Sequence, residues 1–406
     1  MPSSFAWLDY DEASRQRMRE LVGLFQEPGS IDELGLGRIR DAFSDRFFPG
    51  TSVLWRRARY LFFVPWVYGE IEAHGFQRHA NAELAARALL RRLRDALASA
   101  RDTDGVIGLR QADPNSPPDV ILWAALEQWG LREPGGGSLA QYQGTLQRRP
   151  LARGGRDEPG ERYTSWTDRL GAAPDSFPEA VSFRLRGPEA RLLRDLTLQE
   201  DAEEDSLGAR RRDSMMASLL RSGTVTDAPS PWLHPLDAAV SDELRLALHM
   251  SGCFSDVMHG ARLAYALRLA QLRKLTNHAA ELDQEVAAWA NRITLERPEE
   301  LRAWVADLPA FWRIVRGLND RISLGEQTFV ESWSEMALRD PTRAATSPDA
   351  LRLIEAREAV KKGSRARLTA PREKDRGDGG AIPTPITYRW NNGRKIAADI
   401  LDGLVQ

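Results

Sequence analysis

Apolar residues recur every three or four positions in many segments of the chain, which is the spacing that one face of an α-helix presents. An early example is Met18, Leu21, Val22 and Phe25, which lie inside a predicted helix over residues 10–26. Runs that alternate apolar and polar residues, as half-buried strands do, are rare. The pattern therefore predicts a mostly α, multi-helix protein, with more than about 45% of residues in helices and less than about 12% in strands.

The other predicted helices share this periodicity and are bounded by glycines, prolines or capping residues. They cover residues 32–47, 53–67, 80–100, 120–129, 189–198, 238–275, 279–291, 303–319, 328–338 and 350–368, and a last helix lies within 386–404. Pro65 is expected to kink or close the helix over 53–67, because proline removes a backbone donor and clashes with the preceding turn.

Length and local composition predict how the chain divides. A chain of 406 residues exceeds the usual size of a single hydrophobic core, so more than one domain is expected. We predict an N-terminal helical domain over 1–131, a linker or irregular excursion rich in Gly, Pro, Arg and Ser over 132–180, a helical domain over 181–345, and a basic helical C-terminal segment over 346–406. The order helix, turn, helix, turn, arginine-bearing helix near the N-terminus is like that of a helix-turn-helix module.

The chain has a small net charge, and almost all of its basic residues are arginines. The formal net charge of -2 excludes a uniformly basic nucleic-acid coat, although it permits a local basic face. Only five of the 56 basic residues are lysines, so 56 - 5 = 51 are arginines. Two explanations stay open: codon usage in a GC-rich genome, or selection for a planar guanidinium that binds phosphate or carboxylate at two points.

The sequence carries few signals of the compartment in which the protein works. Cys253 is the only cysteine, so the chain cannot form an intrachain disulfide. The longest apolar run, Tyr60–Tyr68, is far shorter than the roughly 20 residues of a membrane helix, and no signal peptide is recognisable. We expect a cytoplasmic protein without membrane contact.

Motifs for metal or nucleotide chemistry are also missing from the sequence. It has no Cys-x-x-Cys, no two histidines at helical spacing, no glycine-rich phosphate loop and no nucleophile elbow, so we expect no metal and no cofactor. Cys253 is interpreted as a buried, inert thiol, with a catalytic pair to His259 as the alternative. The acidic stretch 200–205 is interpreted as a solvated loop, with a metal-dependent nuclease as the alternative.

The segment before the Tyr60–Tyr68 run carries the first nucleic-acid signal. Arg56, Arg57 and Arg59 follow a tight turn and lie beside Trp55 and Tyr60. If this segment is a helix with its arginines on the outer face, its N-terminus suits a phosphate. The alternative is that the aromatic residues belong to the core and the arginines merely cover the helix surface.

Two further basic clusters lie in the predicted helix over 80–100 and near the C-terminus. Their candidate phosphate contacts are Arg91, Arg94, Lys361, Lys362, Arg365 and Arg367. A nucleic-acid backbone is a natural partner for such clusters. The alternative for the C-terminal one is a flexible, solvated basic tail.

Several segments together form a recognisable pattern. They are Ser4–Asp9, Arg38–Phe43, Phe48–Ser52, Arg57–Tyr60, Phe63–Trp66, Val106–Gly108, Leu122–Trp123, Trp129–Gly130, Cys253–Ser255, His259–Ala261, Arg357–Glu358 and Tyr388–Trp390, with Asp399 and Gly403. Together they resemble a bacterial family catalogued as a domain of unknown function. This chain departs from the pattern at Pro117–Asp119, and it lacks a tryptophan before the glycines near 377–380.

The resemblance implies a component of phage-defence or restriction-type gene clusters, encoded beside helicases and nucleases, and it brings no catalytic residues. We therefore expect a non-enzymatic DNA-binding or assembly subunit of a bacterial anti-phage defence complex, with double-stranded DNA and a helicase or nuclease as partners. Two alternatives stay open. One is a protein–protein scaffold without nucleic-acid contact, whose arginines pair with acidic partner surfaces, and the other is a cryptic metal-dependent nuclease.

Overall fold

The computed structural model describes most of the chain as helices. The described residues are 32–76, 79–109, 116–133, 135–148, 166–199, 202–203, 206–370 and 381–405. About 65% of them are helical, in sixteen α-helices and two short 3-10 turns. Within these ranges the only β pairing is two isolated bridges, Ser52–Trp55 and Arg132–Trp166. The mostly α prediction is confirmed, whereas the predicted helix over 10–26 lies outside the described residues.

Five helices lie in the first part of the described chain. They are α2 (Gly37–Phe47), α3 (Tyr60–His74), α4 (Ala82–Ser99), α5 (Pro118–Gln128) and α6 (Leu139–Arg148). The α2 helix begins later than predicted because the Asp32 carboxylate accepts hydrogen bonds from the backbone N–H groups of Leu36 and Gly37, at 2.5 and 3.0 Å. Helix α6 lies inside the segment predicted to be an irregular linker.

The predicted helix over 53–67 is wrong at both ends. Residues 52–59 form turns, and α3 begins at Tyr60, after the arginines, and runs past Pro65 to His74. Every residue of the Tyr60–Tyr68 run is buried. Burial of so much apolar surface outweighs the roughly 3 kcal/mol that an internal proline costs a helix, so the helix continues. The arginine-bearing third helix of a helix-turn-helix module is therefore not formed here.

The remaining helices follow the predicted order, and three short ones, over 207–212, 215–222 and 341–344, were not predicted. The full set is α7 (Gly187–Leu198), α8 (Leu207–Arg212), α9 (Met215–Ser222), α10 (Asp242–Leu272), α11 (Thr276–Leu295), α12 (Pro298–Ala306), α13 (Leu308–Leu318), α14 (Leu324–Arg339), α15 (Pro341–Ala344), α16 (Pro348–Lys362) and α17 (Trp390–Leu404). The single helix predicted over 303–319 is divided because Asp307 ends α12 and its side chain caps α13. The helix predicted over 350–368 ends early, at Lys362.

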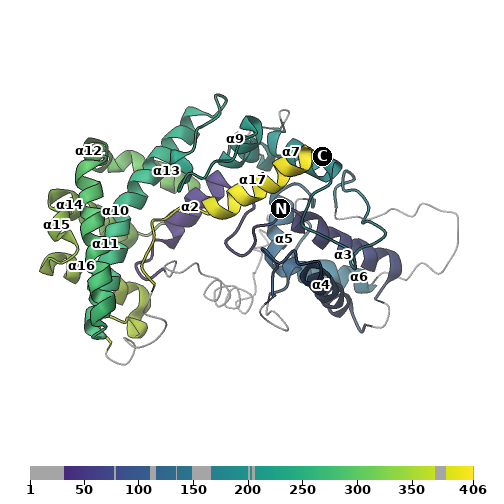
Figure 1. The fold of residues 1–406 in the computed structure, drawn as a ribbon, viewed down its shortest axis with the longest axis horizontal. Helices are drawn as coiled ribbons and strands as arrows, with labels where there is room; N and C mark the ends of the chain where they lie inside the picture. Colours follow the sequence, from purple (N-terminus) through teal and green to yellow (C-terminus); the bar gives the residue numbers. More distant parts are fainter. Residues whose placement is uncertain are drawn as a thin grey trace, which may run out of the picture.

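The helices form two groups joined across one side of the molecule (Figure 1). On the left, α10 packs against α11, α12, α14 and α16, and on the right α3 packs against α4 and α5. Between the groups, α17 packs against α7 and α9, and α2 packs against α9, α10 and α13. Helices from both ends of the chain therefore form the centre. The predicted domain boundaries stay a prediction.

Aromatic side chains fill the contact between α2 and the segment leading into α17. The Tyr388 ring lies edge-on to Phe43 and Phe47, with centroids 5.6 and 5.7 Å away, and Trp390 packs against Phe48 at 6.0 Å. Such edge-to-face pairs add to the energy of burial. The two chain segments are thus packed into a shared core, although some 340 residues separate them.

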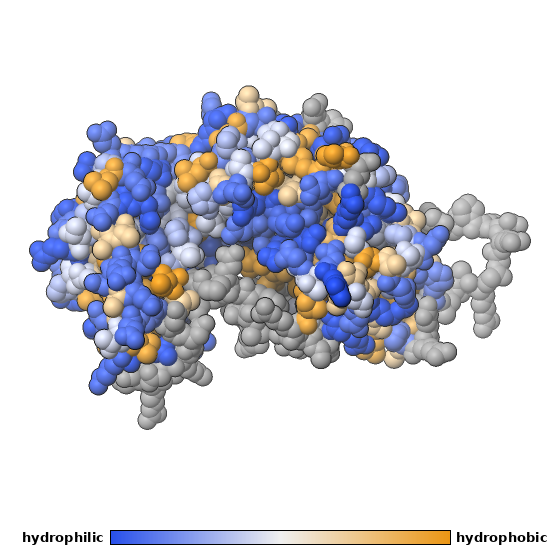
Figure 2. Space-filling model, viewed as in Figure 1, coloured by the Kyte–Doolittle hydropathy of each residue, from blue (hydrophilic) through white to orange (hydrophobic). Residues whose placement is uncertain are grey.

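The visible surface is mostly polar, with apolar side chains in small groups (Figure 2). Among the described helices, none combines the length and the apolar character that crossing a membrane requires.

Candidate functional site: buried arginines and a charged cleft

Arg59 is the most completely satisfied of the arginines singled out from the sequence. Its guanidinium donates through Nε and Nη2 to the two carboxylate oxygens of Glu189, both at 3.0 Å, and through Nη1 to the Ser182 carbonyl at 2.9 Å. It also lies over the rings of Phe63 and Trp66. This two-point geometry is the strong form of an arginine–carboxylate pair. It fixes the start of α3 to the first turn of α7.

Arg57 makes the corresponding link to the last helix. Its Nε donates to Asp399 Oδ2 on α17 at 2.9 Å, and the same oxygen accepts the backbone N–H of Ala58 at 3.1 Å. The guanidinium also stacks on the Phe183 ring, 4.4 Å from its centroid. Asp399 is buried and also pairs with Lys395, one turn earlier, at 3.4 Å. The loop before α3 is therefore held from two sides.

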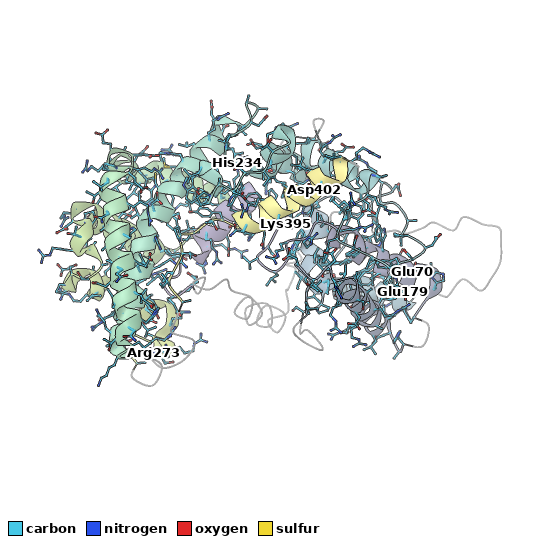
Figure 3. All side chains as sticks on the ribbon, viewed as in Figure 1. Glu70, Glu179, His234, Arg273, Lys395 and Asp402 are labelled. Atoms are coloured by element: carbon cyan, nitrogen blue, oxygen red, sulfur yellow. The ribbon has the colours of Figure 1, made fainter. Side chains whose placement is uncertain are left out.

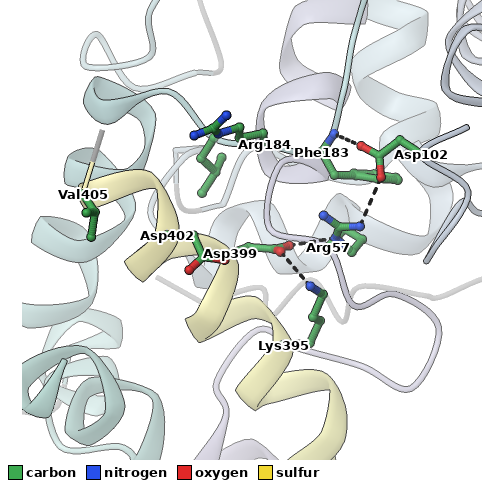
Figure 4. Close-up of a pocket in the computed structure, with 9 residues that line it drawn as sticks. Arg57, Asp102, Phe183, Arg184, Lys395, Asp399, Asp402 and Val405 are labelled. Carbon is green, nitrogen blue, oxygen red and sulfur yellow. Dashed lines mark hydrogen bonds and ion pairs between the residues drawn. The ribbon is translucent and has the colours of Figure 1, made fainter. Parts of the chain in front are cut away.

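A cleft of about 590 Å³ opens beside these pairs, between α17, the segment before α7 and the loop after α4 (Figure 4). Three basic and three acidic side chains line it, namely Arg57, Arg184, Lys395, Asp102, Asp399 and Asp402. Lys395 and Asp402 lie on α17 in the middle of the molecule (Figure 3). Since the charges balance, the cleft offers an anion no strong positive potential.

The carboxylates of this cleft are already engaged. Asp399 binds Arg57 and Lys395, and Asp102 accepts the backbone N–H of Phe183 at 2.6 Å while facing Arg57 at 3.6 Å. No metal-binding group of three ligand-type residues forms here among the described residues. The cleft thus gives no support to a metal-dependent nuclease. Most of the 200–205 acids, on which that alternative rested, lie outside the described residues.

The prediction that Arg56 and Arg57 both lie on the outer face of a helix over 53–67 is therefore wrong. Arg57 and Arg59 are buried, at 8% and 6% exposure, while only Arg56 reaches solvent and pairs there with Asp104. The sequence could not show this, because Asp399 and Glu189 lie 342 and 130 residues away along the chain. Trp55 is buried in the core, as the alternative interpretation held.

The cluster on α4 is more accessible. Arg91 is exposed and has no ion-pair partner within the described ranges. Arg94 is half-buried and pairs with Asp95 at 2.8 Å, and Arg92 pairs with Glu179 from another segment. Neighbouring carboxylates therefore neutralise most of this face.

The C-terminal basic cluster is largely neutralised as well. Lys362 and Arg367 both bind Glu33, at 3.0 and 3.3 Å, and Lys361 faces Asp32 at 3.8 Å. Arg365 is exposed and, among the residues described, has no ion-pair partner. The tail interpretation is wrong for residues 357–368, because this basic segment packs against the residues that precede α2.

Arg357 and Glu358 show how this packing is achieved. Arg357 donates to the carbonyl oxygens of Leu34 and Gly35, at 2.7 and 3.3 Å. The buried Glu358 accepts from the backbone N–H groups of Arg367 and Leu368, both at 2.8 Å. These bonds hold the turn after α16 in place.

His259 is neutral and fixed within the core. Its Nε2 donates to the Pro383 carbonyl at 2.8 Å, and its Nδ1 accepts from Arg292 at 3.0 Å. Burial, assisted by the nearby Arg292 and Arg262, lowers the pKa of His259 to about 4. It does not form the catalytic pair with Cys253 that the sequence left open.

A group of metal-type ligands appears where the sequence analysis expected none. His249, Cys253 and Glu300 place one ligand atom each within 4.8 Å of one another. The signal available in the sequence was His249 and Cys253 at four-residue spacing within a predicted helix. The spacing between histidines does not reveal this group, and Glu300 joins the other two residues only through the packing of α12 on α10.

In the described residues, fold and contacts define an all-helical protein. Its buried arginine–carboxylate pairs join the loop before α3 to α7 and α17. The model of a family of unknown function, DUF6361, matches residues 2–403, and the chain belongs to that family. No curated protein and no solved structure matches the chain. The resemblance to an uncharacterised family is thus confirmed, while its link to phage defence stays a prediction.

Proposed function

We propose that the protein is an assembly subunit of a bacterial defence complex, a helical platform on which partner proteins are held. The observation that carries the proposal is the use of Arg57 and Arg59. Both guanidinium groups are buried and spend their hydrogen bonds on Asp399 and Glu189 within the chain. A group that a DNA phosphate is to contact must be exposed and free to exchange water for phosphate.

The other basic clusters support the same proposal. In the C-terminal cluster, Asp32 and Glu33 neutralise three of the four candidate side chains. Association with nucleic acid depends on releasing counterions from phosphates, and cations paired within the protein contribute little to that release. The platform is thus favoured over the DNA-reading subunit.

Double-stranded DNA binding is the second candidate, and three residues favour it. Arg56, Arg91 and Arg365 have exposed guanidinium groups, of which Arg91 and Arg365 lack an ion-pair partner in the described part of the chain. They lie on different elements, so they would contact phosphates at separate points of a duplex.

The test combines two measurements on the purified full-length chain. The first is co-expression with each protein encoded by a neighbouring gene, followed by size-exclusion chromatography with light scattering. The proposal expects a stoichiometric complex with at least one of them. No complex with any neighbouring gene product would contradict the platform.

The second measurement is fluorescence anisotropy of a labelled duplex at about 50 and 200 mM salt, where phosphate contacts change affinity steeply. The proposal expects weak binding that barely differs between wild type and the variant Arg56→Glu/Arg91→Glu/Arg365→Glu. The control is Arg302→Glu, an exposed arginine on α12 outside the candidate clusters. Tight, salt-steep binding that the triple variant loses and the control retains would establish the second candidate.

A further inference from the structure

The side chains of His249, Cys253 and Glu300 gather at the contact between α10 and α12. His249 and Cys253 are four residues apart on α10, so they lie one turn apart on the same helix face. Glu300 belongs to the first turn of α12 and accepts from His249 Nδ1 at 2.9 Å. An imidazole, a thiol and a carboxylate thus converge from two packed helices.

We propose that these three residues bind a Zn²⁺ ion, with His249 supplying an imidazole nitrogen, Cys253 a thiolate and Glu300 a carboxylate oxygen. This is the donor set that zinc takes in proteins, at metal–ligand distances of about 2.0–2.3 Å. A tetrahedral ion of that size keeps its ligand atoms about 3.3–3.8 Å apart. The three ligand atoms lie within 4.8 Å of one another, so modest side-chain rotation closes the site.

Arg297 competes with the ion in the metal-free arrangement. Its Nε and Nη2 donate to the two carboxylate oxygens of Glu300, at 2.5 and 2.6 Å. Its Nη2 also donates to Cys253 Sγ at 3.6 Å, and its Nη1 donates to Asp256 at 2.7 Å. When the metal takes Glu300 and Cys253, Arg297 retains Asp256 as its partner. The guanidinium therefore acts as an exchangeable counterion for the ligands, and zinc must displace it. Water completes the fourth metal position.

Metal binding must release a proton from the thiol. The metal-bound form is the thiolate, and the proton leaves to solvent. No oxidation or reduction takes place.

Cobalt(II) is the first probe, because it occupies zinc sites and reports its ligands by absorption. Added to the purified full-length chain, it should give a sulfur-to-cobalt charge-transfer band that one equivalent of Zn²⁺ abolishes. Cys253 is the only cysteine, so that band can come from no other residue. A cobalt spectrum without the sulfur band would overturn the proposal.

The variants distinguish this site from adventitious binding. His249→Ala and Glu300→Gln should each weaken zinc binding about tenfold or more, since each removes a ligand. The matched control is His278→Ala, which removes a histidine that also faces a glutamate, Glu281 at 3.3 Å, but has no cysteine nearby. Equal loss in the control and in the ligand variants would contradict the assignment.

Two readouts protect the test against a variant that fails to fold. The cobalt charge-transfer band is read on the unaltered protein and needs no substitution. Arg297→Gln should bind zinc more tightly than wild type, because the competitor for Glu300 is gone. Unchanged or weaker zinc binding in Arg297→Gln would refute the proposal.

Discussion

The buried position of Arg59 decides how its charge acts. A guanidinium removed from water is stabilised only while its carboxylate partner and hydrogen bonds remain, and loss of one partner leaves an uncompensated buried charge. Arg56, three residues earlier, pairs with Asp104 at the surface, where water screens both charges. The same residue type thus has a large structural effect at one position and a small one at the other.

This contrast gives the first prediction. Glu189→Gln should lower the free energy of unfolding by about 3–5 kcal/mol, since it leaves the buried Arg59 charge without its counter-charge. In a double-mutant cycle with Arg59→Met, the two effects should be strongly non-additive. The measurement is urea unfolding followed by circular dichroism. The control cycle, Arg56→Gln with Asp104→Asn, should show a coupling of at most about 1 kcal/mol. Equal coupling in the two cycles would show that burial does not strengthen the Arg59–Glu189 pair.

His259 gives the second prediction at this scale. Its pKa is about 4 in the folded chain and near 6.5 when unfolded, so the unfolded state takes up the proton first as the pH falls. Its contribution to stability is therefore complete above about pH 6.5 and is lost as the pH drops toward 4. The loss amounts to about 3 kcal/mol.

The measurement is the unfolding free energy across that pH range, for wild type and for His259→Gln, whose amide can donate to Pro383 and accept from Arg292. The variant should lose less stability than wild type as the pH falls. His74→Gln, at an exposed histidine, should follow the wild-type curve. If the wild-type and His259→Gln curves run parallel, the buried neutral histidine is not responsible.

Helix positions could be predicted from sequence more reliably than helix contacts. The segments over 80–100, 120–129 and 189–198 predicted α4, α5 and α7 to within a few residues, because their apolar faces and caps are local signals. The start of α3 was predicted wrongly, because it depends on a contact with a distant segment rather than on a local signal. The run after Trp55 offers no cap, and its boundary is set by Asp399, which arrives from the far end of the chain.

The candidate site shows the same limit. The sequence singled out Arg57 and Arg59 as candidate phosphate contacts, but it could not assign them to the interior, because burial depends on the packing of α7 and α17. Ligand residues on one helix, such as His249 and Cys253, follow from spacing alone. Their third partner, Glu300, does not, because nothing local links it to them.

Two helices approach their neighbours through a glycine, and this gives the third prediction. A Cβ on Gly393 of α17 would lie 2.3 Å from the Phe48 ring, and one on Gly260 of α10 would lie 2.2 Å from Trp289. Helix propensity favours alanine by up to about 1 kcal/mol, but overpacking a buried ring costs about 1–3 kcal/mol or more, so the clash should win.

The measurement is the melting temperature of Gly393→Ala and Gly260→Ala, both of which should fall below wild type. Gly69 of α3 is the matched control, because it is helical and nothing lies within 4 Å of its Cβ position. Gly69→Ala should hold or raise the melting temperature. A rise in all three variants would mean that these helices are not packed so closely.

At the scale of the whole molecule, segments that are far apart in the sequence contact one another. The loop before α3, the first turn of α7 and the middle of α17 meet through Arg57 and Arg59, and α2 packs between the two groups of helices. Segments that lie hundreds of residues apart in the sequence therefore depend on one another for their structure. The proposed platform would gain from this arrangement, because a surface formed by both groups of helices keeps its shape.

Native-state hydrogen exchange of Asp399→Asn tests most directly whether the buried arginine–carboxylate pairs make these distant segments one cooperative unit. Amides of residues 58–63 should lose protection together with those of α17, although 341 residues separate Ala58 from Asp399. Asn391→Ala, an exposed change in the first turn of α17, should leave both regions as in wild type. Loss of protection confined to α17 in the Asp399 variant, with residues 58–63 unchanged, would contradict the account.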